Sequence, residues 1–177
     1  MPLAGDADGP YGSLLDRAGA RLDAAGSRDA VVAALRGTAR GIIGSDGIAV
    51  VLRQGDTCFY AAEDAIEPLW TGRRFPLTAC ISGWAMLHRR TVTIADIEGD
   101  PRVPIDAYRR TSIRSLAMAP IGAPEPVAAL GAYWCAAVDI DAATVGRLER
   151  LAALAAAALA RLSFGGIELG ARVAAAG

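Results

Sequence analysis

Three cysteines, Cys58, Cys80 and Cys135, and a single histidine, His88, carry the most reactive chemistry in this sequence. Cys80 directly precedes an expected helix, whose N-terminal end stabilises a thiolate and so favours a nucleophilic or redox-active thiol. Cys58 and Cys135 fall in expected strands, and simple packing of a small thiol accounts for all three cysteines. Their wide spacing and odd number argue against a disulfide framework and against a zinc site of ordinary ligand spacing.

His88 is a candidate haem ligand. It stands at the end of the same expected helix, beside Arg89 and Arg90, where positive side chains interact favourably with the helix terminus. Because nothing else in the sequence supports haem, we expect His88 to have this structural role.

A second group of side chains is suited to holding a flat or anionic ligand, since aromatic rings offer apolar surfaces and arginines bind carboxylates and phosphates. Core packing accounts for at least half of the aromatic residues. Among Arg102, Arg109, Arg110 and Arg114, most are expected at the solvated surface, and Arg114 is the best candidate because it enters a strand. The candidate ligand-binding residues are Trp70, Phe75, Cys80, Trp84, Asp96, Tyr108, Arg114 and Trp134.

Charges nearly cancel in this chain of 177 residues, with 18 basic and 19 acidic side chains and a net charge of −1. We therefore expect neither nucleic acid nor an anionic membrane as a partner. The N-terminus lacks the apolar core of a signal peptide, and the apolar run 151–160 is far shorter than the ~20 residues of a membrane span. These features predict a soluble, cytoplasmic protein with reduced cysteines.

The expected elements position these side chains around one sheet. Periodicity and turn residues predict a flexible N-terminus over 1–10, an N-terminal helix over 11–26 and a flexible tail over 165–177. A second helix capped by Ser27 precedes a hairpin, and Asp139 or Asp141 caps a final helix that runs to Phe164. Gly165-Gly166 is expected to end or fray that helix. A short helix is also expected around Leu69-Trp70. The remaining expected elements are a helix over 28–40, strands over 48–53 and 57–61, a short helix over 81–88, and strands over 91–94, 113–121 and 127–136.

Both terminal helices carry apolar stripes in alternating steps of three and four residues. The first stripe includes Leu15 and Leu22, and the last includes Leu148 and Leu162. Packing on the sheet accounts for one such helix, and two at opposite ends of a domain favour a homodimeric helical bundle.

This order predicts an α+β fold, with a central antiparallel sheet of five or six strands. The long terminal helices would cover one face, and pocket-forming loops would cover the other.

The segment from Cys80 to Ile121 carries a family resemblance. Its motifs are Ser82-Gly83-Trp84, Arg90-Thr91-Val92-Thr93-Ile94, Ala95-Asp96-Ile97, Asp100-Pro101-Arg102 and Ser115-Leu116-Ala117-Met118-Ala119-Pro120-Ile121, followed by Leu130-Gly131-Ala132-Tyr133. In this order they resemble a GAF domain, over residues 27–164 with the final helix included. The segment most resembles GAF domains of bacterial sensor histidine kinases and phytochrome-like signalling proteins.

The resemblance implies a small ligand whose identity the sequence leaves unknown. Bilin-binding members carry a Cys, usually followed by His, in the region that corresponds to 102–112, which has neither here, so covalent bilin attachment is disfavoured. The Asn- and Lys-containing signature of nucleotide-binding members cannot exist in a chain without Asn or Lys.

The resemblance also implies a function. We expect a non-catalytic sensory GAF domain of a bacterial two-component or related system, in which dimeric terminal helices relay a signal to an output domain or partner protein. No GxSxG, P-loop, convincing carboxylate pair or histidine-kinase phosphoacceptor segment is found in the sequence. Two alternatives stay open: a small cysteine-based redox enzyme or sensor resembling free methionine sulfoxide reductase, and a structural GAF domain without a ligand.

Overall fold

The computed structural model describes residues 9–174, of which 165–174 by their backbone alone, so part of the expected N-terminal and C-terminal segments lies outside the described residues. Along the chain, α1 and α2 come first, α3 and α4 lie between strands, and α5 comes last. The helices are α1 (Gly9–Asp23), α2 (Arg28–Ile43), α3 (Ile81–His88), α4 (Ile105–Tyr108) and α5 (Ala142–Ala174). The strands are β1 (Gly47–Gln54), β2 (Thr57–Ala65), β3 (Arg74–Pro76), β4 (Val92–Ile94), β5 (Ser115–Ile121) and β6 (Ala128–Trp134).

The strands form one six-stranded antiparallel sheet in the order β3-β2-β1-β6-β5-β4. Gly55, with φ 62°, makes the tight turn between β1 and β2. A bulge in β2 lets Val50 pair with Ala62 and Val51 with Tyr60. The predicted α+β class and the antiparallel sheet are confirmed, and the sheet has six strands, the larger of the two numbers expected.

Alternate residues of the central strands enter two separate cores, as the two-residue period of a strand requires. In β1, Ile48 and Val50 pack toward the long helices, whereas Ala49 and Val51 pack toward the other side. We call these two sides of the sheet the helix face and the pocket face. All four side chains are buried, so both faces are covered.

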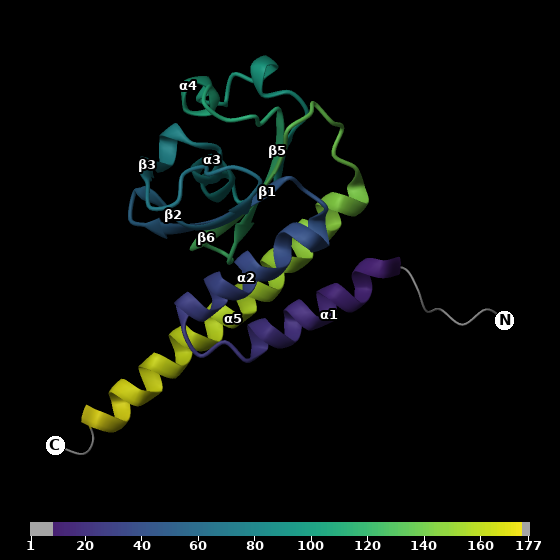
Figure 1. The fold of residues 1–177 in the computed structure, drawn as a ribbon. Coiled ribbons are helices and arrows are strands. Elements are labelled where there is room, and N and C mark those ends of the chain that lie inside the picture. Colours follow the sequence, from purple (N-terminus) through teal and green to yellow (C-terminus); the bar gives the residue numbers. More distant parts are fainter. Residues whose placement is uncertain (1–8, 175–177) are drawn as a thin grey trace.

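The helix face is covered by α2 and α5, and α1 packs against these two helices on the side away from the sheet (Figure 1). Ser27 caps α2 by accepting from the backbone N–H of Ala30 at 3.1 Å, as expected from the sequence. Asp141 caps α5 by accepting from the N–H of Thr144 at 2.7 Å. Small residues such as Ala132 on β6 and Ala155 on α5 are fully buried and let the layers approach closely.

Two expectations about the terminal helices need correction. The predicted stripes, exemplified by Leu15, Leu22 and Leu148, are buried within the chain itself, in the core between the helices and the sheet. The backbone of α5 continues through Gly165-Gly166 to Ala174 instead of ending there. Figure 1 shows this C-terminal part of α5 extending beyond α1 and α2.

The pocket face carries α3, α4 and the connections between strands (Figure 1). Here too the structure differs from expectation, because β2 runs on to Ala65 and a short strand β3 occupies 74–76. The helix expected around Leu69-Trp70 is absent from the described chain, and the segment forms a turn. Among the described residues, no helix combines the length and the apolar character needed to cross a membrane.

Candidate functional site

A carboxylate organises the loop that covers the pocket face. Glu63, at the end of β2, accepts hydrogen bonds from the backbone N–H groups of Leu69, Trp70 and Thr71 at 2.9, 2.9 and 3.0 Å. Three donors on one carboxylate hold the turn in a single conformation. This contact explains why the segment forms a turn and not a helix, and it directs the Trp70 side chain over the sheet.

Two contacts tie this loop to the segment that follows α4. Glu67 accepts from the backbone N–H of Ser112 and from its hydroxyl at 3.2 Å. The indole Nε1–H of Trp70 donates to the carbonyl of Ala107 at 3.4 Å. The covering layer on the pocket face therefore consists of two segments, the loop after β2 and the segment around α4, which these hydrogen bonds join.

Beneath these loops lies an aromatic cluster of five residues. Trp70 is at its centre, with ring centroids 5.6, 4.9 and 5.7 Å from those of Tyr60, Tyr108 and Tyr133. Phe75 packs on Tyr60 at 5.4 Å. All four contacts are edge-to-face, and each is worth about 0.5–1.5 kcal/mol beyond the burial of apolar area. The cluster closes most of the space that the sequence assigned to a ligand, and the cavity left beside Tyr60, Trp70 and Cys80 encloses about 10 Å³.

Cys80 lies at the inner end of this cavity, at the N-cap of α3, with 8% of its surface exposed. Its Sγ is 3.2 Å from the hydroxyl of Ser82, and that hydroxyl is 3.1 Å from the phenol oxygen of Tyr60. The Cys80 thiol also lies 3.5 Å from the carbonyl of Pro76. Cys58, on β2, is buried in the same core cluster, and each of the two thiols affects the pKa of the other, so thiols from two different elements lie near one another in the core.

The surroundings shift the pKa values of the Cys80 and Cys58 thiols in opposite directions. The hydrogen bond from Cys58 lowers the pKa of Cys80, with further help from Ser82 and the backbone N–H of Gly83, and it outweighs the opposing effect of burial. The same bond, together with burial, raises the pKa of Cys58. Burial also raises the pKa of the Tyr60 and Tyr108 phenols, which stay protonated at neutral pH. Of the two thiols, Cys80 is therefore the one that more readily forms a thiolate, and Cys58 is the one that keeps its proton.

Gly83 holds Cys80 at this depth. A Cβ atom at Gly83 would meet the carbonyl oxygen of Leu77 at 1.8 Å, so only glycine allows α3 to pack on the turn Leu77–Ala79. That packing fixes the start of α3, and with it the position of the Cys80 sulfur against β2.

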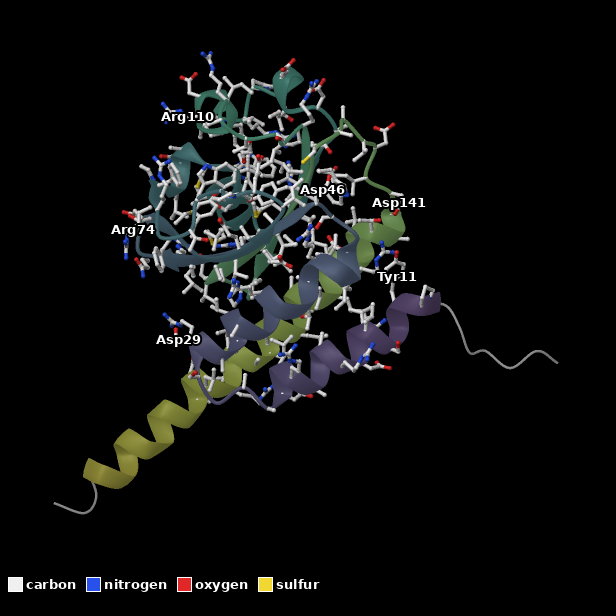
Figure 2. The ribbon with its side chains drawn as sticks, viewed as in Figure 1. Tyr11, Asp29, Asp46, Arg74, Arg110 and Asp141 are labelled. Atoms are coloured by element: carbon white, nitrogen blue, oxygen red, sulfur yellow. The ribbon has the colours of Figure 1, made fainter. Side chains whose placement is uncertain are left out.

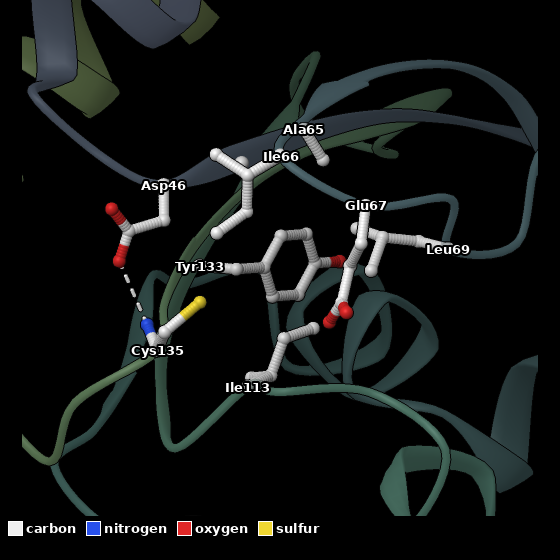
Figure 3. Close-up of a pocket in the computed structure, with 9 residues that line it drawn as sticks. Asp46, Ala65, Ile66, Glu67, Leu69, Ile113, Tyr133 and Cys135 are labelled. Carbon is white, nitrogen blue, oxygen red and sulfur yellow. Dashed lines mark hydrogen bonds between the residues drawn. The ribbon is translucent and has the colours of Figure 1, made fainter.

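The third thiol has a different environment. Cys135 follows β6 at a cavity of about 10 Å³ lined by Asp46, Glu67 and Tyr133. Figure 3 shows the Asp46 carboxylate accepting from the backbone N–H of Cys135, at 2.8 Å. Burial, followed by the charges of Asp46 and Glu67, raises the pKa of the Cys135 thiol, so it is the poorer nucleophile at neutral pH.

Tyr133 fills the pocket face from β6. A Cβ atom at Gly131 would lie 2.8 Å from the Tyr133 hydroxyl oxygen and 2.8 Å from the Met118 side chain, so the glycine makes room for the ring. Among the described residues, the Tyr133 hydroxyl has no hydrogen-bond partner although it is buried.

Four of the eight ligand-binding residues predicted from the sequence line the same cavity. They are Trp70, Phe75, Cys80 and Tyr108.

The other four lie elsewhere. Trp84 stacks on His88 with ring centroids 4.1 Å apart, and the Arg90 and Arg102 guanidiniums lie 5.1 and 4.9 Å from its ring centre. Asp96 caps the turn Ile97–Gly99 and pairs at 3.6 Å with Arg114, and both are solvent-exposed.

Trp134 packs against the core on the helix face, and its indole N–H donates to the carbonyl of Gly44 at 3.2 Å. His88 keeps the structural place expected for it, with its Nδ1 2.9 Å from the carbonyl of Trp84.

Sequence reasoning missed two members of the aromatic cluster, Tyr60 and Tyr133, as well as Ser82 beside Cys80, and it gave Cys58 only a packing role. Cys58 and Tyr60 are two residues apart in a strand and so share a face, which is the signal that could have joined them. Nothing local in the sequence indicates that Cys58 and Cys80 meet. Within the described residues, no three His, Cys, Asp or Glu side chains gather closely enough to hold a metal ion.

Comparison with solved structures places the chain among proteins of one fold. A free methionine-R-sulfoxide reductase from Neisseria meningitidis, with its substrate bound, aligns with TM-score 0.75 and 19% identity over 92% of this chain and 95% of that one. The GAF domain of an Acinetobacter phosphoenolpyruvate-protein phosphotransferase aligns with TM-score 0.74 and 14% identity over 88% and 96%. The phycocyanobilin-bound GAF domain of a cyanobacterial phytochrome gives 0.72 and 17% over 88% and 96%. Curated protein sequences give no match.

These neighbours correct one expectation. The sequence predicted a non-catalytic domain, but a protein of the same fold is a methionine sulfoxide reductase, which is an enzyme. The fold therefore does not support a non-catalytic assignment, and an enzymatic role is compatible with it. The phosphotransferase and phytochrome GAF domains among the neighbours show that the same fold also occurs in these proteins.

The family model of the GAF domain matches residues 15–160, which span the sheet, the covering loops and most of the helix layer. The resemblance noted in the sequence is thereby confirmed, and the chain belongs to the GAF domain family.

Proposed function

We propose that this GAF domain is a thiol redox module in which Cys80 is the reactive nucleophile and Cys58 is its disulfide partner. The observation that carries the proposal is that two thiols with opposite pKa shifts are buried in one core, where Cys80 lines the aromatic cavity and its sulfur contacts the Ser82 hydroxyl at 3.2 Å. A buried cysteine that only packs has no need of a second thiol, a serine hydroxyl and a backbone N–H converging on its sulfur.

The chemistry is a two-electron reduction of a small oxygen-atom donor. The Cys80 thiolate attacks one oxygen of a peroxide, the O–O bond breaks, and the departing hydroxide takes up a proton to give water and Cys80 sulfenic acid. The Cys58 sulfur then attacks the Cys80 sulfur, the S–O bond breaks, and hydroxide leaves with the Cys58 proton as a second water. One peroxide and two thiols thus yield one disulfide and two waters.

Cavity size selects among oxygen-atom donors. The space at Cys80 encloses about 10 Å³, roughly the room of one water molecule. Hydrogen peroxide is the donor that comes nearest to this size. Free methionine sulfoxide, the substrate class of the Neisseria neighbour, would need the loops around Trp70 and Tyr108 to open. In that case the sulfoxide oxygen would pass to Cys80: the S–O bond of the sulfoxide breaks, an S–O bond to the Cys80 sulfur forms, a proton is taken up, and a thioether and Cys80 sulfenic acid result.

The test follows consumption of hydrogen peroxide, and separately of free methionine sulfoxide, by the full chain with dithiothreitol as the external dithiol. Wild type should consume peroxide with turnover, and Cys80→Ser should lose this activity. In a single turnover without dithiothreitol, Cys58→Ser should stop at the sulfenic acid, which dimedone traps on Cys80. Cys135→Ser is the matched control and should behave as wild type. Turnover that survives Cys80→Ser would overturn the proposal, as would equal loss in all three variants.

The helix layer favours a second, regulatory role. The strand β5 contacts α3 on the pocket face and α5 on the helix face, so a change at the Cys80 end of α3 has a short route to α5. We propose that this bacterial, cytoplasmic domain passes its redox state through α5 to an output domain or a partner protein, as in two-component systems.

The apolar stripes of α1 and α5 are buried within the chain itself, so a homodimer that relays the signal needs a different surface. The outward side of α5 has a second row of exposed residues, Ala153, Ala157, Ala160 and Phe164, in steps of four, three and four. Phe164 is 71% exposed. We propose a homodimer through this row. Analytical ultracentrifugation should show a dimer that Phe164→Glu and Ala157→Glu convert to monomer, and a monomeric wild type at high micromolar concentration would contradict it.

A further inference from the structure

A groove of about 400 Å³ lies outside the aromatic cavity, between the loop before β3 and the helix α4. Its volume falls within the range typical of small-molecule sites. Leu69, Trp70 and Phe75 line one side, and Ala107, Arg110 and Thr111 line the other. Trp70, Phe75 and Ala107 also line the inner cavity, so one wall separates the groove from Cys80.

The charge of the groove is positive. Arg73 lines it from the loop before β3 and Arg110 from the turn after α4. Figure 2 shows Arg110 at the outer edge of the covering layer. Within the described part of the chain, neither guanidinium makes an ion pair. The acidic residue of the groove, Asp106, is paired with Arg109 at 3.0 Å. Two uncompensated cations therefore share one concave surface.

The floor between these cations is apolar. Arg73 lies over the ring of Phe75, with its guanidinium carbon 5.3 Å from the centroid, and this cation–π contact holds it beside the groove. Phe75 and Leu69 are half-buried, and Trp70 presents the edge of a buried ring. A guanidinium that is already held in place loses less conformational entropy on binding an anion than one on a freely rotating side chain.

From this arrangement we infer that the groove binds a small organic anion: a carboxylate attached to a flat apolar group. The carboxylate would lie between Arg73 and Arg110, where a guanidinium fork matches its two oxygens. The flat group would pack on Phe75 and Leu69. The ligand class is chosen by charge complementarity and by the apolar floor, and the site is separate from the thiol pair.

The groove borders the hydrogen bond between Trp70 and Ala107. The 3.4 Å hydrogen bond from the Trp70 indole to the Ala107 carbonyl crosses the wall shared with the inner cavity. A ligand in the groove contacts both residues, so the Trp70 Nε1–H reports binding directly. Trp84 and Trp134 lie outside the groove and serve as internal references.

The experiment titrates the ¹⁵N-labelled full chain with benzoate and, in parallel, with neutral benzamide, and follows the indole N–H signals. The Trp70 signal is assigned with Trp70→Phe. Benzoate should shift the Trp70 signal saturably and leave Trp84 and Trp134 unmoved, and benzamide should bind at least about tenfold more weakly. Arg73→Gln and Arg110→Gln should each weaken benzoate binding by about tenfold, which corresponds to about 1.4 kcal/mol. Arg17→Gln, on the exposed surface of α1, is the matched control and should leave binding unchanged.

Two results would overturn the inference: absence of a saturable Trp70 shift, or binding that is equal for benzoate and benzamide and survives the double variant Arg73→Gln/Arg110→Gln. The same titration in Cys80→Ser separates this site from the thiol chemistry, because benzoate should bind that variant as it binds wild type. Raising the ionic strength should weaken benzoate binding, since exposed charges are screened by salt.

Discussion

On the helix face of the sheet, the alternate residues of β1, β5 and β6 are alanine, valine, leucine and isoleucine, whereas the pocket face adds Met118 and Tyr133 from these strands and Cys58 and Tyr60 from β2 to its aliphatic residues. The same strands supply both faces. The helix face meets α2 and α5, which α1 backs on their outer side, and it contains mostly small, chemically inert side chains packed against one another. The pocket face meets short helices and loops and contains thiols, phenols and a serine in mutual contact. Stability is therefore expected to depend mainly on the first face, and reactivity on the second.

The largest stability effect should come from the helix face. Leu151, fully buried in α5, loses its packing in Leu151→Ala, and we expect a loss of about 2–5 kcal/mol in the free energy of unfolding. Urea denaturation followed by circular dichroism measures this loss. The rate at which peroxide oxidises Cys80 in the folded variant should stay that of wild type, and a changed rate would break the separation of the two faces.

A substitution at Gly83 should change both the stability of the fold and the reactivity of Cys80. In Gly83→Ala the new Cβ meets a backbone carbonyl, and overpacking of this kind costs about 1–3 kcal/mol. Displacement of α3 should also slow oxidation of Cys80. Gly146→Ala, where a Cβ meets nothing within 4 Å in α5, is the matched control and should raise stability by up to about 1 kcal/mol. A destabilising Gly146→Ala or a harmless Gly83→Ala would contradict this account.

Two phenols on the pocket face should respond differently to the same change. Tyr60→Phe removes a buried hydroxyl that is bonded to Ser82, at a cost of about 0.5–1.5 kcal/mol. Tyr133→Phe removes a buried hydroxyl with no partner among the described residues, so its effect should be close to zero or stabilising. Thermal unfolding of the two variants side by side measures the difference, and equal losses would show that Tyr133 has a partner.

A smaller effect should appear in the pH dependence of the Cys80 thiol. Its lowered pKa means that alkylation by iodoacetamide should reach half its maximal rate below the value of about 8.5 typical of a free thiol. Cys58→Ala removes the main donor to the thiolate, so the pKa of Cys80 should rise and the rate at neutral pH should fall. Cys58→Ser keeps a donor and should shift the profile less. Cys135 should titrate above the ordinary value.

The fold was predictable because its signals are local. Ser27, Asp141 and the Gln54-Gly55-Asp56 turn mark element ends through short-range hydrogen bonds and backbone preferences, and all three mark element ends or turns in the structure. The stretch around Leu69-Trp70 misled because its turn depends on the Glu63 carboxylate, which lies six residues away from Leu69. A side chain that bonds three distant backbone groups leaves no periodic pattern.

The candidate site was predictable only in part, for a related reason. Trp70, Phe75, Cys80 and Tyr108 share one cavity because the predicted order of elements places them on the covering layer and the short helix. Trp134 alternates with Tyr133 in β6 and so enters the opposite face, which its aromatic character alone does not reveal. The meeting of Cys58 and Cys80 depends on the register of β2 with β3, where Cys58 pairs with Phe75, and register is not readable from either segment alone.

If Cys80 is the reactive thiol, hydrogen peroxide oxidises the Cys58–Cys80 pair before the more exposed Cys135. This order can be measured by oxidising the reduced wild-type protein with one equivalent of hydrogen peroxide, followed by alkylation and peptide mass spectrometry. We expect a Cys58–Cys80 disulfide, with Cys135 alkylated as a free thiol. Oxidation of Cys135 while Cys58 and Cys80 remain free thiols would show that the pair is not the reactive site.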